Sequence, residues 1–435
     1  VTVSVLYWSS TMPSEKPLPP HLSPAQRAAS LRDYDKVPAN CVVTGGTGIV
    51  GMRLVEMLVE RGAKRVVCFD VVPKDRIKFV WDHPAIEYVT GDITDAAAVD
   101  KAIAGADCVW HLAAAVGPFH PKPIYEKVNL GGTKNVIASC KKHNAKLVYS
   151  SSPSTRFEGS MFKAPNVDGL TEAQMPELPL KAWMQEYART KALGELAMRA
   201  AVAADPNFLA VAVAPHQVYG PRDNLFLPNM LEAAGTGKLR VFGPGTNRIC
   251  MTHVDNYAHA LIIAEPKLFK GSPILGKFYI ATDGDTHPEP DAYCIFWKEL
   301  DQAVVAMGFT SLWSKFKLPF PLLYALALVC ELVGWVLGTT FKLNVFNVFV
   351  LTMHRWFDIT AIEKDLGYKP IIPYSVGWPD TIEWFKKNWL PGFLETGKNA
   401  GVIGIAEQSQ AKINVQADST LGERLNGGAQ KKKSQ

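Results

Sequence analysis

Residues 44–51 read Thr-Gly-Gly-Thr-Gly-Ile-Val-Gly, and this stretch decides the fold. It follows a short apolar run, Val42-Val43. It precedes residues 52–58, where apolar side chains recur at the spacing of an amphipathic helix. A strand, a glycine turn and a helix in this order are typical of a dinucleotide-binding motif.

The glycines have separate tasks in such a motif. Gly45 permits the tight turn, Gly48 lets the backbone approach the phosphates, and Gly51 lets helix and strand pack closely. Ile49 stands at the start of the predicted helix, whose free N–H groups and dipole favour an anion. We therefore predict that this turn binds the pyrophosphate of a dinucleotide.

The residues that follow the next apolar runs specify the cofactor further. Asp70 ends the run 66–69, where a carboxylate accepts hydrogen bonds from both ribose hydroxyls and repels a 2′-phosphate. NAD is therefore favoured over NADP. Asp92 and Ile93 follow the third strand, where a short acid meets the adenine amino group. Ala113 follows the fourth, and its small size lets the chain run close beneath the cofactor.

Apolar runs alternate with helical stretches over the first half of the chain. Runs that are apolar on both faces are typical of a parallel sheet covered by helices. The predicted fold class is α/β, a doubly wound parallel sheet of the Rossmann type with a smaller C-terminal substrate-binding cap. We place the NAD-binding domain at residues 37–225 and the cap at residues 226–397. The further predicted strands are residues 86–89, 108–112, 147–149 and 208–213.

Tyr187 and Lys191 stand one helical turn apart, on one face of a predicted helix. A tyrosine hydroxyl has a pKa of about 10 and is a poor base at neutral pH. The ammonium of Lys191 and a bound nicotinamide are expected to lower that pKa, so that the phenolate takes the proton of an alcohol as hydride leaves. A second hydroxyl is expected from the serines that end the fifth strand. The residues alone leave the choice between Ser151 and Ser152 open.

These motifs belong to a longer set: residues 44–51, 92–93, 111–114, 128–135, 151–154, 187–191, 215 and 219–221. In them the chain resembles the extended short-chain dehydrogenase/reductases and, among these, the 3β-hydroxysteroid dehydrogenase group. The resemblance runs from about residue 40 to about residue 390. It implies that Ser152 is the catalytic hydroxyl and Tyr187 the acid/base. It also implies that Lys191 holds the ribose and lowers the tyrosine pKa, and that Pro215 lies near the nicotinamide.

Residues 157–159, 253–256 and 362–370 resemble the decarboxylating sterol dehydrogenases of this group. The resemblance implies NAD-dependent oxidation of the 3β-hydroxyl of a 4α-carboxysterol, with loss of the 4-carboxylate as carbon dioxide, in sterol C4 demethylation. A homodimer and contacts with other enzymes of that pathway stay open. Ala214 departs from the arginine usual before the proline, and Arg156 stands where the group is usually apolar. Arg156 meets either a substrate carboxylate or, as a loop residue, solvent.

Three other functions are compatible with these residues. A 3β-hydroxysteroid dehydrogenase/isomerase shares every catalytic residue named and differs only in its pocket. A nucleotide-sugar epimerase or dehydratase has the same scaffold, but the apolar segment described below argues against a soluble, charged substrate. A non-catalytic NAD-binding membrane protein commonly lacks the tyrosine or the lysine, whereas this chain has both. An NAD(P)-dependent oxidoreductase acting on CH–OH is therefore favoured.

A hydrophobic segment at residues 318–351 indicates a membrane association. Its core, residues 320–341, is interrupted only by Glu331 and approaches the roughly 20 residues that cross a bilayer. Residues 357–370 resemble part of the same folded domain, which a single crossing would separate from the rest. We therefore predict monotopic insertion into one leaflet, suited to a membrane-dissolved sterol. A buried helix of the cap is the alternative.

The two ends of the chain differ from its middle. Residues 1–36 lack a convincing signal peptide and are expected to be a flexible extension. Residues 398–435 are polar and are expected to be a flexible tail. Lys432 and Lys433 resemble the dilysine retrieval signal of endoplasmic-reticulum membrane proteins, the alternative being a solvated basic tail. We predict a location at that membrane, with the catalytic domain facing the cytosol.

The composition agrees with a large globular enzyme. The chain has 435 residues, 48% of them hydrophobic, which is enough for a sizeable core. Its net charge of +5 is modest and predicts no nucleic-acid surface. Seven cysteines without a Cys-x-x-Cys pair are expected to be reduced. The ten histidines have no zinc spacing, so no metal site is expected, and His111 is expected to be a hydrogen-bonded core residue.

Overall fold

The protein is described by a computed structural model that covers residues 17–117, 120–160, 162–165, 167–337, 341 and 343–396. Its centre is a seven-stranded sheet in the order β11-β7-β5-β4-β1-β2-β3, and every pairing is parallel. The strands are β1 (Asn40–Thr44), β2 (Arg65–Asp70), β3 (Ile86–Thr90), β4 (Cys108–His111), β5 (Lys146–Ser150), β7 (Ala210–Pro215) and β11 (Phe278–Ala281).

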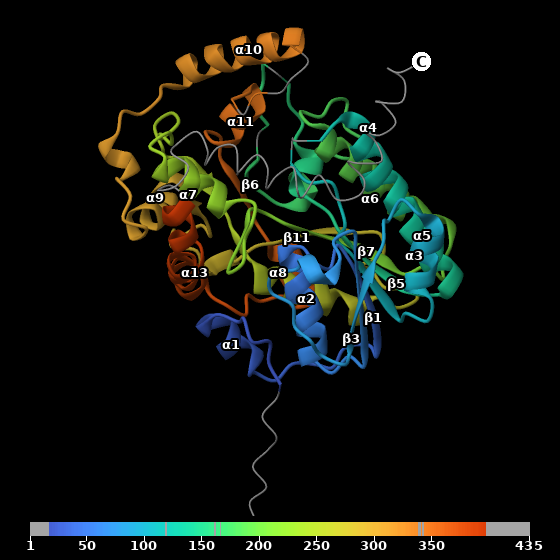
Figure 1. The fold of residues 1–435 in the computed structure, drawn as a ribbon. Helices are drawn as coiled ribbons and strands as arrows, with labels where there is room; N and C mark the ends of the chain where they lie inside the picture. The colour runs from blue at the N-terminus through green and yellow to red at the C-terminus, as the bar shows by residue number, and fades with distance from the viewer. Residues whose placement is uncertain are drawn as a thin grey trace, which may run out of the picture.

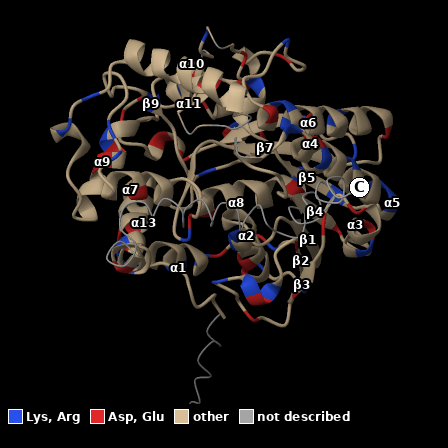
Figure 2. Cartoon of the chain, turned by 45° about the horizontal axis from the view of Figure 1, so that its top comes forward, with Lys and Arg blue, Asp and Glu red and all other residues tan. Residues whose placement is uncertain are grey.

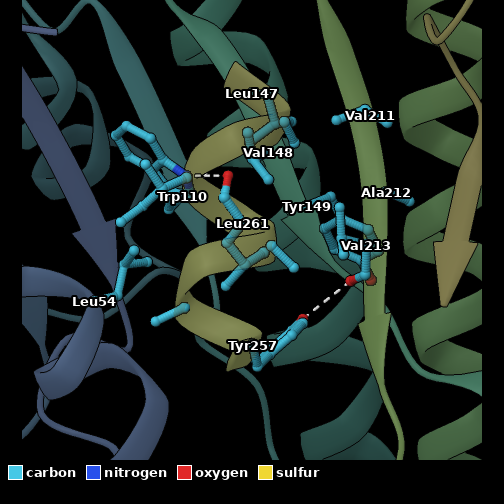
Figure 3. Close-up of a cluster of buried hydrophobic side chains, with 14 of the residues drawn as sticks. Leu54, Trp110, Leu147, Val148, Tyr149, Val211, Ala212, Val213, Tyr257 and Leu261 are labelled. Atoms are coloured by element: carbon cyan, nitrogen blue, oxygen red, sulfur yellow. Dashed lines mark hydrogen bonds between the residues drawn. The ribbon is translucent and has the colours of Figure 1, made fainter. Parts of the chain in front are cut away.

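Helices cover both faces of this sheet (Figure 1). On one face lie α2 (Ile49–Glu60) and α8 (Val254–Ala264), and on the other α3 (Ala96–Ile103), α5 (Thr133–His143) and α6 (Glu186–Ala204). Figure 3 shows how α8 is joined to the sheet: the indole of Trp110 donates to the carbonyl of Leu261 at 2.9 Å, and the Tyr257 hydroxyl donates to the carbonyl of Val213 at 3.0 Å. The doubly wound parallel sheet is confirmed, together with its predicted strands.

The cap lies beside the sheet and has a small sheet of its own, ordered β12-β9-β13-β6. It is formed by strands β6 (Val167–Leu170), β9 (Arg248–Ile249), β12 (Cys294–Ile295) and β13 (Arg355–Phe357), with helices α7 (Leu227–Gly235), α9 (Phe296–Ala306) and α13 (Tyr374–Asn388). Strands β8 (Val218–Tyr219) and β10 (Thr252–His253) pair separately, and α4 (Lys122–Tyr125) and α12 (Thr360–Leu366) are short.

The predicted boundary between residues 225 and 226 is wrong, because the two parts are interleaved. Strand β6 comes before it in sequence yet belongs to the cap sheet, whereas α8 and β11 come after it and complete the large sheet. Apolar patterning predicts an element without telling which sheet it joins. Pairing between strands distant in the chain decides that.

The N-terminal extension also differs from its prediction. Helix α1 (Pro24–Ser30) begins at a capping box formed by Ser23 and Gln26, and it is docked onto the body of the protein. Its Gln26 donates to Asp255 at 2.7 Å, and its Ser30 accepts from Arg53 at 2.7 Å. Residues 17–36 are therefore not a flexible extension, because these buried polar side chains satisfy one another. Residues 1–16 lie outside the described part.

The hydrophobic segment forms α10 (Phe320–Leu337) and α11 (Val345–Val350). In the part of the chain that the structure describes, none of the helices combines the length and the apolarity needed to span a bilayer. One side of α10 packs on α11, and the opposite side exposes large apolar side chains. In Figure 2 the helix is drawn almost entirely without charged residues. The tail from residue 398, including Lys432 and Lys433, lies outside the described residues.

Candidate active site

The glycine turn joins β1 to α2 with very close backbone contacts. Gly45 has a φ of +70°, and a Cβ there would lie 2.7 Å from the backbone nitrogen of Ala113. A Cβ on Gly51 would lie 2.0 Å from the carbonyl oxygen of Gly45. Gly48 is the N-cap of α2 and offers no capping side chain, so the N–H groups of the first turn, which begins at Ile49, lack a side-chain cap. This is the arrangement that binds a pyrophosphate.

Asp70 is held beside this turn. One carboxylate oxygen accepts from the backbone N–H of Thr47 at 3.0 Å, and the other accepts from that of Val72 at 3.2 Å. The side chain is only half-buried, and each oxygen retains a second lone pair for a ribose hydroxyl. The structure therefore brings Asp70 to the position that the sequence motif requires.

The remaining predicted cofactor contacts differ in what they offer. Asp92 follows β3 and accepts from the backbone N–H of Thr94 at 2.8 Å. Ile93 is buried, and its side chain fills the space that a Cβ on Gly132 would occupy. A cofactor contact by Ile93 is thus limited to its backbone. Ala113 N–H donates to the Thr44 hydroxyl at 3.3 Å.

Tyr187 is the second residue of α6. Burial raises the pKa of Tyr187 to about 12, and the nearby side chain of Ser152 opposes part of that rise. The predicted lowering of this pKa by Lys191 and a bound nicotinamide concerns the protein with cofactor and stays a prediction. The ammonium of Lys191 donates to the carbonyl of Ser150 at 2.5 Å.

Lys191 is nearly inaccessible to solvent and lies over the ring of Tyr149, with its ammonium 4.3 Å from the ring centre. Burial lowers the pKa of Lys191 to about 7, against a smaller opposing influence of Glu195. Helical spacing does place Lys191 and Tyr187 on the same side of α6. The lysine side chain is long enough to reach the end of β5, where its ammonium donates to the partly buried carbonyl of Ser150.

The three serines at the end of β5 have different partners. The Ser150 hydroxyl is 2.7 Å from that of Tyr257, and the Ser151 hydroxyl donates to Glu195 at 2.8 Å. Of the three, Ser152 is the one whose side chain influences the pKa of Tyr187. It also lies 2.8 Å from the hydroxyl of Ser154. The geometry therefore distinguishes Ser152 from Ser151, which the residues alone did not.

Arg156 meets neither solvent nor an open pocket. It is buried, its two terminal nitrogens lie 2.5 and 2.8 Å from the carboxylate of Glu195, and its guanidinium covers the ring of Phe278 at 3.5 Å. Both sequence-based alternatives for Arg156 are therefore wrong. Because Glu195 also binds Ser151, the ion pair holds the serine turn against α6.

Asn129, which the sequence analysis includes only within the motif at residues 128–135, joins two parts of the site. It lies in the π-helical turn Glu126–Gly132 and is fully buried. Its amide accepts from the N–H of Ala115 at 2.8 Å and donates to the hydroxyl of Thr190 at 3.2 Å. The loop after β4 is thus tied to α6. No spacing in the sequence indicates a π-helical turn, so this role was missed.

Two further predictions concern His111 and Pro215. His111 is fully buried in β4, with its ring nitrogens 2.7 Å from the Thr44 hydroxyl and 2.9 Å from the Thr133 hydroxyl. Its role as a hydrogen-bonded core residue is confirmed. Pro215 ends β7 beside the serine turn, since Ser151 N–H donates to the carbonyl of Val213 at 2.8 Å.

Comparison with known proteins places this site in a family. The model of the 3-beta hydroxysteroid dehydrogenase/isomerase family matches residues 42–307, more than half of the chain. The chain belongs to this family. It is an NAD(P)-dependent oxidoreductase.

Named relatives fall into more than one activity. The human protein "Sterol-4-alpha-carboxylate 3-dehydrogenase, decarboxylating" is 30% identical, and the match covers 81% of this chain and 91% of the human one. The "3beta-hydroxysteroid-dehydrogenase/decarboxylase isoform 2" of Arabidopsis thaliana is 32% identical over 79% of this chain but 62% of the plant protein. A "2-alkyl-3-oxoalkanoate reductase" of Stenotrophomonas maltophilia is 30% identical over 77% of this chain and 96% of that protein.

Solved structures at lower identity share the fold. The dTDP-glucose 4,6-dehydratase of Bacillus anthracis, in complex with NAD, has a TM-score of 0.59 at 18% identity and covers 81% of this chain and 99% of its own. The epimerase Mth375 of Methanothermobacter thermautotrophicus has a TM-score of 0.60 at 19% identity, covering 86% and 98%. Both show the extended short-chain dehydrogenase/reductase architecture.

Proposed function

We propose that this protein oxidises the 3β-hydroxyl of a 4α-carboxysterol with NAD and releases the 4-carboxylate as carbon dioxide. The observation that carries the proposal is the 2.5 Å bond from Lys191 to the carbonyl of Ser150, which holds α6, with Tyr187 in its first turn, against the end of β5 and the serines there. The family and the named decarboxylating relatives support the substrate class.

The residues divide the chemistry between them. Ser152 donates a hydrogen bond to the substrate oxygen, and Tyr187 as phenolate takes the hydroxyl proton. NAD, when bound, accepts the hydride that leaves the alcohol carbon. Its positive nicotinamide and the Lys191 ammonium then favour the phenolate that burial alone disfavours in the free protein. Asp70 and the first turn of α2 are the groups suited to its ribose and pyrophosphate.

Decarboxylation then follows from the product itself. The new 3-ketone lies β to the carboxylate, so the carbon–carbon bond breaks and its electron pair moves to the ketone oxygen as an enolate. The enolate carbon afterwards takes up a proton from water. This step requires no further acid or base from the chain beyond a hydrogen-bond donor to the ketone oxygen, which Ser152 supplies.

The second candidate substrate is a 3-hydroxy acid that has no sterol skeleton. The name of the bacterial relative denotes a 3-oxo acid, and the names of the sterol enzymes denote a carboxylate beside the 3-position. In both substrate classes the carboxylate is bonded to the neighbour of the carbon that changes between alcohol and ketone. The exposed apolar face of α10 favours the sterol, which is dissolved in a membrane.

We also propose that α10 lies in one leaflet of a membrane. Leu322, Leu326 and Val329 are 45 to 57% exposed, and Val336 is 68% exposed, although all are apolar. The one charged residue of the helix, Glu331, accepts from the first N–H of α11 at 2.9 Å, so its carboxylate is occupied within the protein. An apolar helix face of this kind suits monotopic insertion. A location at the endoplasmic reticulum stays a prediction.

The proposal is tested by incubating purified protein and NAD with a 4α-carboxysterol, a 3β-hydroxysteroid without the carboxylate and a 2-alkyl-3-hydroxy acid. NADH and carbon dioxide are followed together. We expect equal amounts of both from the carboxysterol. Tyr187→Phe should lower turnover by about a thousandfold while NAD still binds. NADH without carbon dioxide would refute decarboxylation, and turnover of the bacterial-type acid alone would select the second candidate.

A further inference from the structure

Arg355 is a buried cation without a carboxylate partner. It lies in β13 and is 6% exposed. One terminal nitrogen lies 3.2 Å from Nε2 of His216, and its Nε, buried from solvent, has no hydrogen-bond partner. Among the described residues no carboxylate oxygen comes within the 4.0 Å of an ion pair with it. Burial accordingly lowers the pKa of Arg355 to about 10.

Three other buried arginines among the described residues are neutralised by acids. Their pairs are Arg53 with Glu60 and Asp255, Arg156 with Glu195, and Arg222 with Glu56. Arg61 is the useful comparison, because it is also 6% exposed, bonds a histidine, His259, at 3.1 Å, and has a buried Nη2 without a hydrogen-bond partner. However, Arg61 is the C-cap residue of α2, where the helix dipole favours a cation, and the charges of Glu60 and Asp255 also raise its pKa. Arg355 lies in a strand, which provides no such dipole.

The neighbours of Arg355 border the catalytic edge of the sheet. His216 directly follows Pro215, the last residue of β7, which adjoins the strand that ends in the serine turn. Phe357 is two residues beyond Arg355 in the same strand, and its ring lies 5.1 Å from that of His216. Phe357 also stacks on Phe157, which follows the serine turn, at 6.5 Å. Arg355 is thus placed between the catalytic edge and the cap.

His216 orients the guanidinium without adding charge. Its Nδ1 lies 2.7 Å from the carbonyl oxygen of Cys250, so this nitrogen carries the proton and Nε2 accepts from Arg355. Burial lowers the pKa of His216 to about 3, which keeps the ring neutral. A neutral acceptor compensates one N–H of Arg355 and leaves the positive charge unbalanced.

We propose that Arg355 binds the carboxylate of the substrate and selects 3-hydroxy acids over alcohols that lack the acid. The proposal rests on the proposed function, since it concerns the substrate of that same site. A guanidinium and a carboxylate form strong, paired hydrogen bonds. A carboxylate entering here would pair a charge that burial otherwise penalises. Arg355 is then a specificity-determining residue, while Tyr187 and Ser152 carry the reaction.

The test compares a 4α-carboxysterol with its methyl ester, which keeps the shape and the 3-hydroxyl but has no charge. NADH formation is measured for wild type, Arg355→Met, Arg355→Lys and the matched control Arg61→Met. We expect wild type to prefer the acid by at least about tenfold in kcat/KM. Arg355→Met should lose about a hundredfold on the acid, chiefly through KM, and little on the ester. Arg355→Lys should recover part of the preference, and Arg61→Met should retain all of it.

Each result either supports or refutes the proposed carboxylate site at Arg355. A wild type that oxidises the ester as well as the acid refutes the carboxylate site, and this measurement needs no variant that might misfold. An Arg355→Met protein that retains the preference, or loses acid and ester equally, assigns the residue a structural role only. A wild type that oxidises neither compound refutes the proposed function itself. If a 2-alkyl-3-hydroxy acid is the substrate instead, the same comparison with its ester applies.

Discussion

The ammonium of Lys191 donates a 2.5 Å hydrogen bond to the carbonyl of Ser150, and so joins α6 to the end of β5. Tyr187 precedes the lysine by one helical turn, and Ser152 follows the carbonyl by two residues. One buried contact therefore holds the two elements that carry the reacting hydroxyls. Lys191 positions the site in the free protein and is available to the ribose and the phenolate once NAD is present.

The oxidation rate should rise with pH between 7 and 9. The base is the phenolate of Tyr187, and burial raises its pKa to about 12 in the free protein. Below that pKa the phenolate fraction grows about tenfold for each pH unit. Bound nicotinamide lowers that pKa, so the rise should flatten towards the upper end of this range. Lys191, whose pKa burial lowers to about 7, loses its charge over the same range and makes the rise shallower than tenfold per pH unit. The measurement is the initial rate of NADH formation at limiting sterol, and a rate that falls over this range would contradict the assigned base.

Gly51→Ala should abolish NAD binding. The added Cβ would lie 2.0 Å from the carbonyl oxygen of Gly45, so the turn or α2 must move. We expect at least a hundredfold weaker binding by calorimetry, because the phosphate-binding N–H groups move with the helix. Gly392→Ala is the control, since a Cβ there meets nothing within 4 Å. Equal affinity in the two variants would remove the turn from the cofactor site.

Glu195→Gln should destabilise the fold by about 3 kcal/mol, as expected when one partner of a buried ion pair is removed. The change leaves Arg156 without its anion and weakens the acceptor of Ser151. Glu87→Gln is the control, because its pair with Arg65 is exposed and worth at most about 1 kcal/mol. Urea unfolding measures both. Similar midpoints for the two variants would show that the Arg156 pair is dispensable.

Leu326→Glu combined with Val329→Glu should release the protein from lipid vesicles. Both side chains lie on the exposed face of α10, so a charge there costs little in water and several kcal/mol in the bilayer. Leu31→Glu is the control, because Leu31 is 62% exposed and follows α1, at the opposite end of the molecule in Figure 1. Co-sedimentation with phosphatidylcholine vesicles measures the effect. Equal sedimentation of both variants would exclude α10 as the membrane contact.

Much of the central sheet was predictable because its signals are local. The glycine turn, Asp70 and six of its seven strands follow from short apolar runs and from spacing within a few residues. Strand β11 was missed, since it lies beyond residue 225, in the part of the chain that was assigned to the cap. The docking of α1 was missed as well, because the sequence does not show that Gln26 donates a hydrogen bond to the distant Asp255.

The sequence by itself determined the chemistry of this protein. A residue type at a given spacing on one helix or one turn is settled by backbone geometry, so the phenol, the cation and the phosphate-binding turn could be named in advance. Only the tertiary structure decided which serine meets Tyr187, where the Lys191 ammonium points, and that Arg156 is neutralised while Arg355 is not. Those outcomes depend on which buried group finds a partner, and the partners come from segments far apart in the chain.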